Sequence, residues 1–264
     1  MTKQAPYTLK KSLGQHFLKD DNVCLRIIEA LGKNEFSQLL EVGPGGGALT
    51  KHLLPLKGID FKAVELDDEK VSYLESTYPE IKNKIIHRDF LEIDPPFEGP
   101  FTIIGNFPYN ISSQILFKAI DWKDQVECLI GMFQKEVAQR VAAPPGSKVY
   151  GVTSVLVQAY FSVEYLFDVL PGSFNPPPKV VSGVLKMLPK KPFGSNDGIN
   201  ETPEMRSEKQ FKNLVKTAFN QRRKQLRNAV KGLFSEEILR DEIFTKRAEQ
   251  LSIQDFARLT FKMT

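Results

Sequence analysis

Gln38-Leu39-Leu40-Glu41-Val42-Gly43-Pro44-Gly45-Gly46-Gly47-Ala48 is the stretch that decides the fold. Its apolar first half predicts a buried strand, its glycines predict a close loop, and Leu49 to Leu54 predicts a helix. Strand, glycine loop and helix in this order are typical of the nucleotide-binding half of a Rossmann-like fold. The glycines let the backbone approach a ligand, and the helix start offers N–H groups to it. Because Gly43-x-Gly45-x-x-Ala48 suits either ligand, this loop leaves NAD and S-adenosylmethionine open.

Acidic residues end the next two predicted strands. Asp60 to Glu65 is the second strand, and a carboxylate at its end accepts hydrogen bonds from both ribose hydroxyls of either cofactor. Lys84 to Asp89 is the third strand, and Asp89 is placed to accept a hydrogen bond from the adenine amine. A second acid at this position favours S-adenosylmethionine.

The stretch Gly105-Asn106-Phe107-Pro108-Tyr109-Asn110 follows a fourth predicted strand, Phe101 to Ile104. Ligand sites in open α/β sheets lie where strands end. Because Pro108 fixes its own φ, the loop is stiff, and it presents an amide and a tyrosine ring that suit a nucleobase. The competing interpretation is a turn that caps the following helix, which begins near Ser112.

Further elements complete an α/β sheet. Val126 to Phe133, Tyr160 to Leu170 and Gly183 to Leu188 predict strands, residues 134–141 predict a helix, and Asp20 or Asp21 caps an early helix. The loop of residues 143–147 is a candidate lid or RNA-contacting segment. The proline-rich loop at 174–180 exposes Phe174, either as part of a polyproline connector or as a stacking partner for a flipped base.

Composition divides the chain into three parts. Residues 1–188 form the catalytic domain, residues 189–203 are a polar linker rich in proline and glycine, and residues 204–264 form a helical module. Residues 190–264 carry sixteen Lys and Arg against ten Asp and Glu, and no acid lies between Glu208 and Glu236. The basic segment from Gln221 to Lys231 predicts either an RNA-tracking face of an amphipathic helix or a solvated basic face.

Several classes of protein are disfavoured. The sequence has no apolar run long enough for a membrane helix and no secretory signal, and its two cysteines lack CxxC spacing. We therefore expect a cytoplasmic protein with reduced thiols. The three histidines are scattered without metal-ligand spacing, so we expect no metal site.

Six motifs taken together resemble the small-subunit ribosomal RNA adenine N6-dimethyltransferases, the KsgA group. They are residues 11–18 (KSLGQHFL), 41–45 (EVGPG), 64–67 (VELD), 105–112 (GNFPYNIS), 174–180 (FNPPPKV) and 218–224 (AFNQRRK). The resemblance implies a class I S-adenosylmethionine-dependent methyltransferase domain of Rossmann-like α/β fold, followed by a small all-helical C-terminal domain. It also implies a monomer that acts on small-subunit rRNA within pre-ribosomal particles.

The resemblance also implies the roles of individual residues. Cofactor contacts fall on His16, Leu18, Gly43, Glu65, Asp89 and Asn106, and the glycine loop adds Gly45. Independently of the resemblance, the basic segments predict RNA contacts at Lys11, Arg222, Arg223, Lys224 and Arg227. Two positions depart from the common pattern, because His16 replaces a frequent Asn and Phe107 replaces a commoner Leu. We expect His16 to act through its main chain and Phe107 to pack as leucine does.

The implied reaction is methylation of N6 of two adjacent adenosines in the 3′-terminal hairpin of small-subunit rRNA, giving N6,N6-dimethyladenosine. The Asn106 side-chain oxygen and the Pro108 carbonyl would accept hydrogen bonds from the two N–H groups of the amine. Tyr109 and Phe174 would stack on the two faces of the flipped base. Positioning and preorganised dipoles then replace a strong general base.

Three alternatives remain at this point. They are a large-subunit rRNA methyltransferase of the antibiotic-resistance group, a non-enzymatic nucleic-acid-binding relative, and an NAD oxidoreductase. The proline triplet and the 219–224 motif favour the small-subunit group. Asn106 and Tyr109 favour an enzyme, and no catalytic His or Tyr-Lys pair for an oxidoreductase is recognisable.

Overall fold

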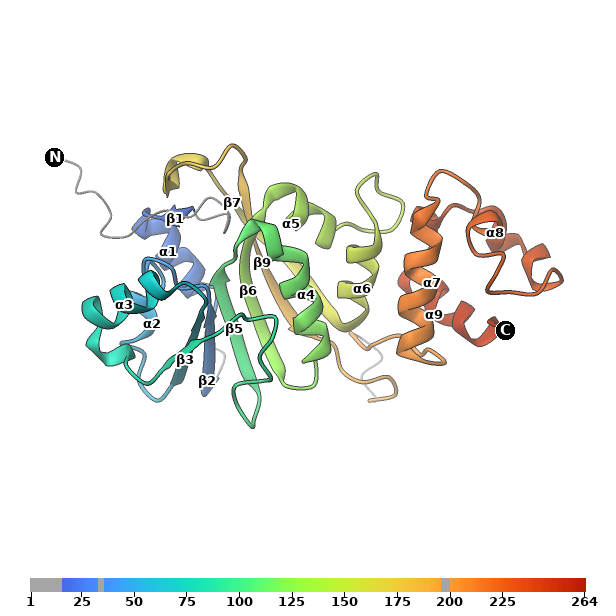
Figure 1. The fold of residues 1–264 in the computed structure, drawn as a ribbon. Coiled ribbons are helices and arrows are strands. Elements are labelled where there is room, and N and C mark those ends of the chain that lie inside the picture. Colours follow the sequence, from blue (N-terminus) through green and yellow to red (C-terminus); the bar gives the residue numbers. More distant parts are fainter. Residues whose placement is uncertain (1–15, 33–35, 196–199) are drawn as a thin grey trace. The chain divides into compact units, whose positions relative to one another are not determined.

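A computed structural model describes residues 16–32, 36–195 and 200–264. Within these residues, seven strands form one sheet in the order β4-β3-β2-β5-β6-β9-β7 (Figure 1). The strands are β2 (Gln38–Val42), β3 (Asp60–Glu65), β4 (Ile85–His87), β5 (Phe101–Asn106), β6 (Val126–Gln134), β7 (Phe161–Val169) and β9 (Ser182–Pro189). The pairs from β4 through β6 are parallel, and β9 runs antiparallel to β6. The predicted α/β fold of Rossmann-like class is confirmed.

A second, two-stranded sheet joins distant parts of the chain. Strand β1 (Phe17–Leu18) pairs antiparallel with β8 (Phe174–Asn175), so that Leu18 lies opposite Phe174. Strands β1 and β8 have only two residues each, which is too short for a periodic pattern in the sequence to predict them. This pairing attaches the first described residues of the chain to the loop that precedes β9.

The α-helices among the described residues are α1 (Asp21–Glu29), α2 (Thr50–Leu53), α3 (Asp68–Thr77), α4 (Ser112–Asp121), α5 (Lys135–Val141), α6 (Val152–Tyr160), α7 (Glu208–Asn220), α8 (Leu226–Ala229) and α9 (Ile253–Leu259). Of these, α2, α3 and α4 connect parallel strands of the sheet, whereas α7, α8 and α9 follow its last strand. The carboxylates of Asp20 and Asp67 accept backbone N–H groups at the starts of α1 and α3, and Ser252 and Asp255 form a capping box at α9. Helix α4 packs against β6 (Figure 1).

The chain divides into two compact units. The first comprises residues 1–138 and 164–188, and the second comprises residues 139–163 and 189–264. The predicted boundary after residue 188 coincides with a boundary between the units. Residues 139–163, which we expected in the first domain, instead pack with the C-terminal residues. They include α6, a helix that the sequence reasoning missed.

The second unit has its own core. One face of α7 buries Phe211, Leu214, Val215 and Ala218, as the helical spacing predicts. The Phe219 ring lies between the Tyr150 and Phe256 rings, with centroid distances of 6.0 and 5.9 Å. Tyr150 comes from the segment before α6, which explains why that segment belongs to this unit.

Two local predictions are wrong. The basic segment 221–231 is not one helix, because α7 ends at Asn220 and a turn separates it from the four-residue α8. Ser112 does not cap α4 but is its first residue, and its hydroxyl donates to the carbonyls of Pro108 and Tyr109. The first error arises because helical spacing does not reveal where a chain reverses, and the second because the helix begins one residue earlier than predicted.

Among the described residues, no helix is both long enough and apolar enough to cross a bilayer.

Candidate functional site

A pocket of about 460 Å³ lies at the carboxyl ends of the parallel strands, within the first unit. Gly43 follows β2, Glu65 ends β3 and Asn106 ends β5, so the sheet brings their loops together. The volume is within the usual range for a small-molecule site. All seven predicted cofactor residues line it: His16, Leu18, Gly43, Gly45, Glu65, Asp89 and Asn106.

The glycine loop supplies the floor of this pocket. At Gly45 the backbone has a φ of +55°, and a Cβ there would lie 3.0 Å from the Phe17 ring. At Gly47 the φ is +79°, and a Cβ would lie 2.5 Å from the Tyr78 ring. A side chain at either position would clash with an aromatic ring and would strain the backbone, so both positions require glycine.

Glu65 is almost fully buried and already accepts three backbone N–H groups. One oxygen accepts from Gly45 at 3.0 Å, and the other accepts from Leu66 and Asp67 at 2.9 and 3.0 Å. Burial raises the pKa of this carboxyl, and the three N–H groups oppose the rise. A carboxylate has about four lone-pair sites, so hydrogen bonds from two ribose hydroxyls would require one of the three N–H groups to yield its place. The ribose role of Glu65 stays a prediction.

Asp89 and Leu66 line the pocket near Glu65. One Asp89 oxygen accepts the Leu91 N–H at 2.8 Å. Leu66 is 50% exposed although it is apolar. Sequence reasoning missed Leu66, and its signal was its place directly after the strand-ending acid.

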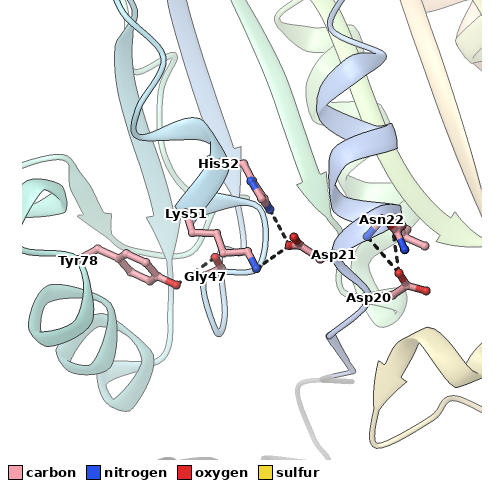
Figure 2. A network of polar contacts seen from close by, with 8 residues as sticks. Asp20, Asp21, Asn22, Gly47, Lys51, His52 and Tyr78 are labelled. Carbon is pink, nitrogen blue, oxygen red and sulfur yellow. Dashed lines mark hydrogen bonds and ion pairs between the residues drawn. The ribbon is translucent and has the colours of Figure 1, made fainter.

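A polar network joins α1 to α2, the helix that follows the glycine loop. Asp21 of α1 accepts from Lys51 and His52 of α2 at 2.6 and 2.8 Å (Figure 2). The hydrogen bond from Lys51 makes the largest contribution to the lowered pKa of Asp21, and the hydrogen bond from His52 makes the next largest. Tyr78 approaches from another element, and its hydroxyl lies 3.5 Å from the Gly47 carbonyl. Lys51 and Tyr78 also line the pocket, and no sequence motif marks either residue.

The end of β5 presents a polarised amide. The Asn106 side-chain nitrogen donates to the His16 carbonyl at 3.1 Å. Because the nitrogen is held by a main-chain oxygen, the Asn106 oxygen is the part of the amide that remains as an acceptor. The Pro108 carbonyl accepts the Ile111 N–H and the Ser112 hydroxyl, both at 3.2 Å.

Phe107 anchors this loop in the core. Its ring is buried, meets the Phe133 ring edge to face at 5.2 Å, and lies over Gly105 and Gly131. The ring is therefore packed in the core, and the expectation that it packs as leucine does stays a prediction. Two glycines on adjacent strands make room for the ring.

Tyr109 and His16 face one another at the pocket. Their ring centroids lie 5.6 Å apart with the planes tilted by 31°. The His16 Nδ1 lies 3.0 Å from the Pro176 carbonyl, so this nitrogen carries the hydrogen. His16 therefore uses its side chain as well as the main chain that we expected to matter.

Phe174 does not present an exposed ring, and this prediction is wrong. The side chain is 1% exposed and belongs to the core of the first unit. Its residue pairs with Leu18 in the small sheet, which draws the ring inward. A role in stacking would require the ring to be uncovered.

The basic residues of the second unit divide into two kinds. Arg222 donates to Glu249 at 3.4 Å and to the Lys148 carbonyl, so it holds its own unit together. Arg223 and Lys224 are exposed, whereas Arg227 is half-buried. The remaining RNA candidate, Lys11, lies outside the described residues.

These features define a class of protein. A sheet of this order, with a glycine loop after β2 and acids after β3 and β4, belongs to the Rossmann-like methyltransferases that use S-adenosylmethionine as methyl donor. The family model for ribosomal RNA adenine dimethylase matches residues 7–262, and the chain belongs to that family. This membership decides between the two cofactors that the glycine loop left open.

Relatives of known name agree with this assignment. The chain is 51% identical over 257 residues to the ribosomal RNA small subunit methyltransferase A of Parabacteroides distasonis, covering 95% of this chain and 92% of that protein. It is 49% identical to the protein of the same name from Flavobacterium johnsoniae, covering 96% and 95%.

Solved structures share the fold. A dimethyladenosine transferase from Plasmodium falciparum superposes with a TM-score of 0.75 at 26% identity, covering 92% of this chain and 96% of that one. The 23S rRNA methyltransferase ErmE superposes with a TM-score of 0.71 at 20% identity, covering 94% and 99%, which shows likeness of fold alone.

Proposed function

We propose that this protein methylates N6 of adenosine in small-subunit rRNA, converting two adjacent adenosines of the 3′-terminal hairpin to N6,N6-dimethyladenosine. The observation that carries the proposal is the Asn106 amide, which lines the pocket with its nitrogen held by the His16 carbonyl. Family membership and relatives about half identical support the choice of rRNA as substrate. We further propose that the protein acts as a cytoplasmic monomer on pre-ribosomal small-subunit particles.

The chemistry needs hydrogen-bond acceptors more than a base. The adenine amine is a poor nucleophile because its lone pair is delocalised into the ring. S-Adenosylmethionine supplies an electrophilic methyl group on a sulfonium. The Asn106 oxygen and the Pro108 carbonyl accept hydrogen bonds from the two N–H groups of the amine, and this arrangement directs the nitrogen lone pair out of the ring plane. A bond forms from N6 to the methyl carbon as the carbon–sulfur bond breaks, and the methylated nitrogen then loses a proton to water.

The hydrogen bonds around Pro108 permit this role. Its carbonyl accepts from the Ser112 hydroxyl, but that hydroxyl also lies 3.1 Å from the Tyr109 carbonyl. Ser112 therefore retains a partner when an incoming N–H takes its place at Pro108. The exchange leaves no buried hydroxyl without a hydrogen bond, so it costs little free energy.

The test is single-turnover methylation of undermethylated small-subunit particles, with mapping of the modified bases. We expect Asn106→Ala to slow transfer on the order of 10²- to 10³-fold, because a preorganised hydrogen-bonding group is lost at the reacting centre. Gln139→Ala removes an amide from the exposed face of α5 and serves as the control. Near-normal methylation by folded Asn106→Ala would refute the proposed role of the amide.

We propose that Arg223 and Lys224 contact RNA phosphates, because both are exposed within a stretch that contains no acid. Alanine at both positions should weaken particle binding and lower the slope of log affinity against log salt by about 2, with an unchanged melting temperature. Arg222→Ala should lower the melting temperature as well, because Arg222 holds Glu249 and the Lys148 carbonyl. An unaltered salt slope in the double variant would place the RNA elsewhere.

A further inference from the structure

The hydroxyl of Tyr109 has a partner that no motif reveals. It lies 2.6 Å from the hydroxyl of Ser182, which is 73 residues away in the sequence. Ser182 is the first residue of β9, and its side chain is 0% exposed. A hydrogen bond of this length between two hydroxyls, one of them fully buried, is short and shielded from water.

Ser182 is fixed by the sheet. It lies opposite Gln134 in the antiparallel ladder between β6 and β9, and its neighbour Gly183 is closely packed by Tyr165 and Ala138. The Ser182 hydroxyl can therefore move little. The far end of the Tyr109 ring is tied to the central sheet by a strand that supplies no residue to the pocket lining.

Two other contacts complete the support of Tyr109. Its main-chain carbonyl accepts the Ser112 hydroxyl at 3.1 Å, and its ring meets the His16 ring. These contacts fix the start of the side chain and its approximate place. The hydrogen bond at the tip limits the remaining freedom, which is the swing of the ring about the first side-chain torsion.

We propose that Ser182 is a positioning residue that holds the Tyr109 ring in the place where the target adenine stacks on it. This inference rests on the proposed function, in which Tyr109 supplies the stacking face. Without the Ser182 hydroxyl, the ring rotates more freely and its own half-buried hydroxyl loses its partner. When the Tyr109 ring is less restrained, the base stacked on it presents its amine to Asn106 in the reactive geometry for a smaller fraction of the time.

The experiment is a double-mutant cycle on single-turnover methylation of undermethylated particles, using Ser182→Ala, Tyr109→Phe and the combined variant. Tyr109→Phe keeps the stacking ring and removes only the hydroxyl. We expect each single variant to lose about tenfold in rate, which is about 1.4 kcal/mol of transition-state stabilisation. The combined variant should be no slower than either, because both changes remove the same hydrogen bond.

Affinity and stability separate positioning from a general structural role. Calorimetry should give an S-adenosylmethionine Kd within about twofold of wild type for Ser182→Ala, since Ser182 does not line the pocket. Ser154→Ala is the matched control, because Ser154 is equally buried and its hydroxyl donates to the Arg140 carbonyl in the second unit. It should lower the melting temperature with little change in methylation rate.

Two results would overturn the inference. One is a Ser182→Ala rate within twofold of wild type, and the other is a combined loss near a hundredfold, the product of the two single effects. If Ser182→Ala does not fold, Tyr109→Phe tests the same hydrogen bond from its other end. Wild-type protein that methylates no particle would instead refute the proposed function, so the two failures are distinguishable.

Discussion

Gly131 of β6 is a position where one added methyl group should damage the catalytic loop. A Cβ at Gly131 would lie 2.8 Å from Phe107 Cδ2 and from Phe133 Cε2, and closer still to Phe107 Cε2. Ordinary carbon contacts are about 3.5–4.0 Å, so the Phe107 ring would have to move by roughly 1 Å. That ring is buried between two glycines and Phe133, which leaves it no free direction.

Two effects of Gly131→Ala oppose each other. Replacing glycine reduces the freedom of the unfolded chain and stabilises by about 0.4–1 kcal/mol. Overpacking of a buried site costs about 1–3 kcal/mol, and the short contacts to two rings place Gly131 toward the upper end. We expect a net loss of about 2 kcal/mol and a melting temperature lower by about 4–8 °C.

The assay is thermal unfolding combined with single-turnover methylation. We expect the rate to fall as well, because Phe107 lies between Asn106 and Pro108 and shifts both when it moves. The compensating change Phe107→Leu, which supplies a smaller side chain, should restore part of both losses. Gly172→Ala is the control, since a Cβ there meets nothing within 4 Å. A Gly131→Ala protein with wild-type stability and rate would refute the described packing of Phe107.

Two further predictions concern the pocket. Gly47→Ala and Gly58→Ala both place alanine at a φ near +75°, but only the Cβ at residue 47 meets the Tyr78 ring. Calorimetry should therefore show weaker S-adenosylmethionine binding for Gly47→Ala and unchanged binding for Gly58→Ala. Burial raises the pKa of Glu41 from 4.5 to about 8. Between these pH values the folded protein keeps a proton that the unfolded chain has released, so the free energy of unfolding falls as pH rises. Melting of Glu41→Gln relative to wild type should therefore improve from about pH 5 to about pH 8, and a flat or reversed trend would contradict the buried acid.

Local sequence determines the strands and the residues at their ends. The bounds of β2 and β3 agree with the prediction, and Glu65 and Asn106 fall at strand ends as the sequence predicts. This works because parallel strands buried on both faces require continuous apolar stretches. Their shared direction then gathers their carboxyl ends at one edge, so order along the chain locates the pocket.

Other predictions failed where residues meet from distant parts of the chain. Phe174 reads as an exposed aromatic because it precedes three prolines, yet its pairing with Leu18 buries it. The basic stretch after Asn220 reads as a helix because its apolar residues keep helical spacing, yet the chain turns there. The periodicity of apolar side chains predicts which residues are buried. It does not predict which distant residues pack against them.

The sequence by itself determined the Rossmann-like fold and the place of the pocket at the strand ends, because periodicity and strand-end chemistry are local properties. Only the tertiary structure decided how Tyr109 and Phe107 are held. Ser182 reaches Tyr109 across 73 residues, and Gly131 makes room for Phe107 from a neighbouring strand. Such contacts depend on strand order and register, which bring residues together without leaving a pattern at either position.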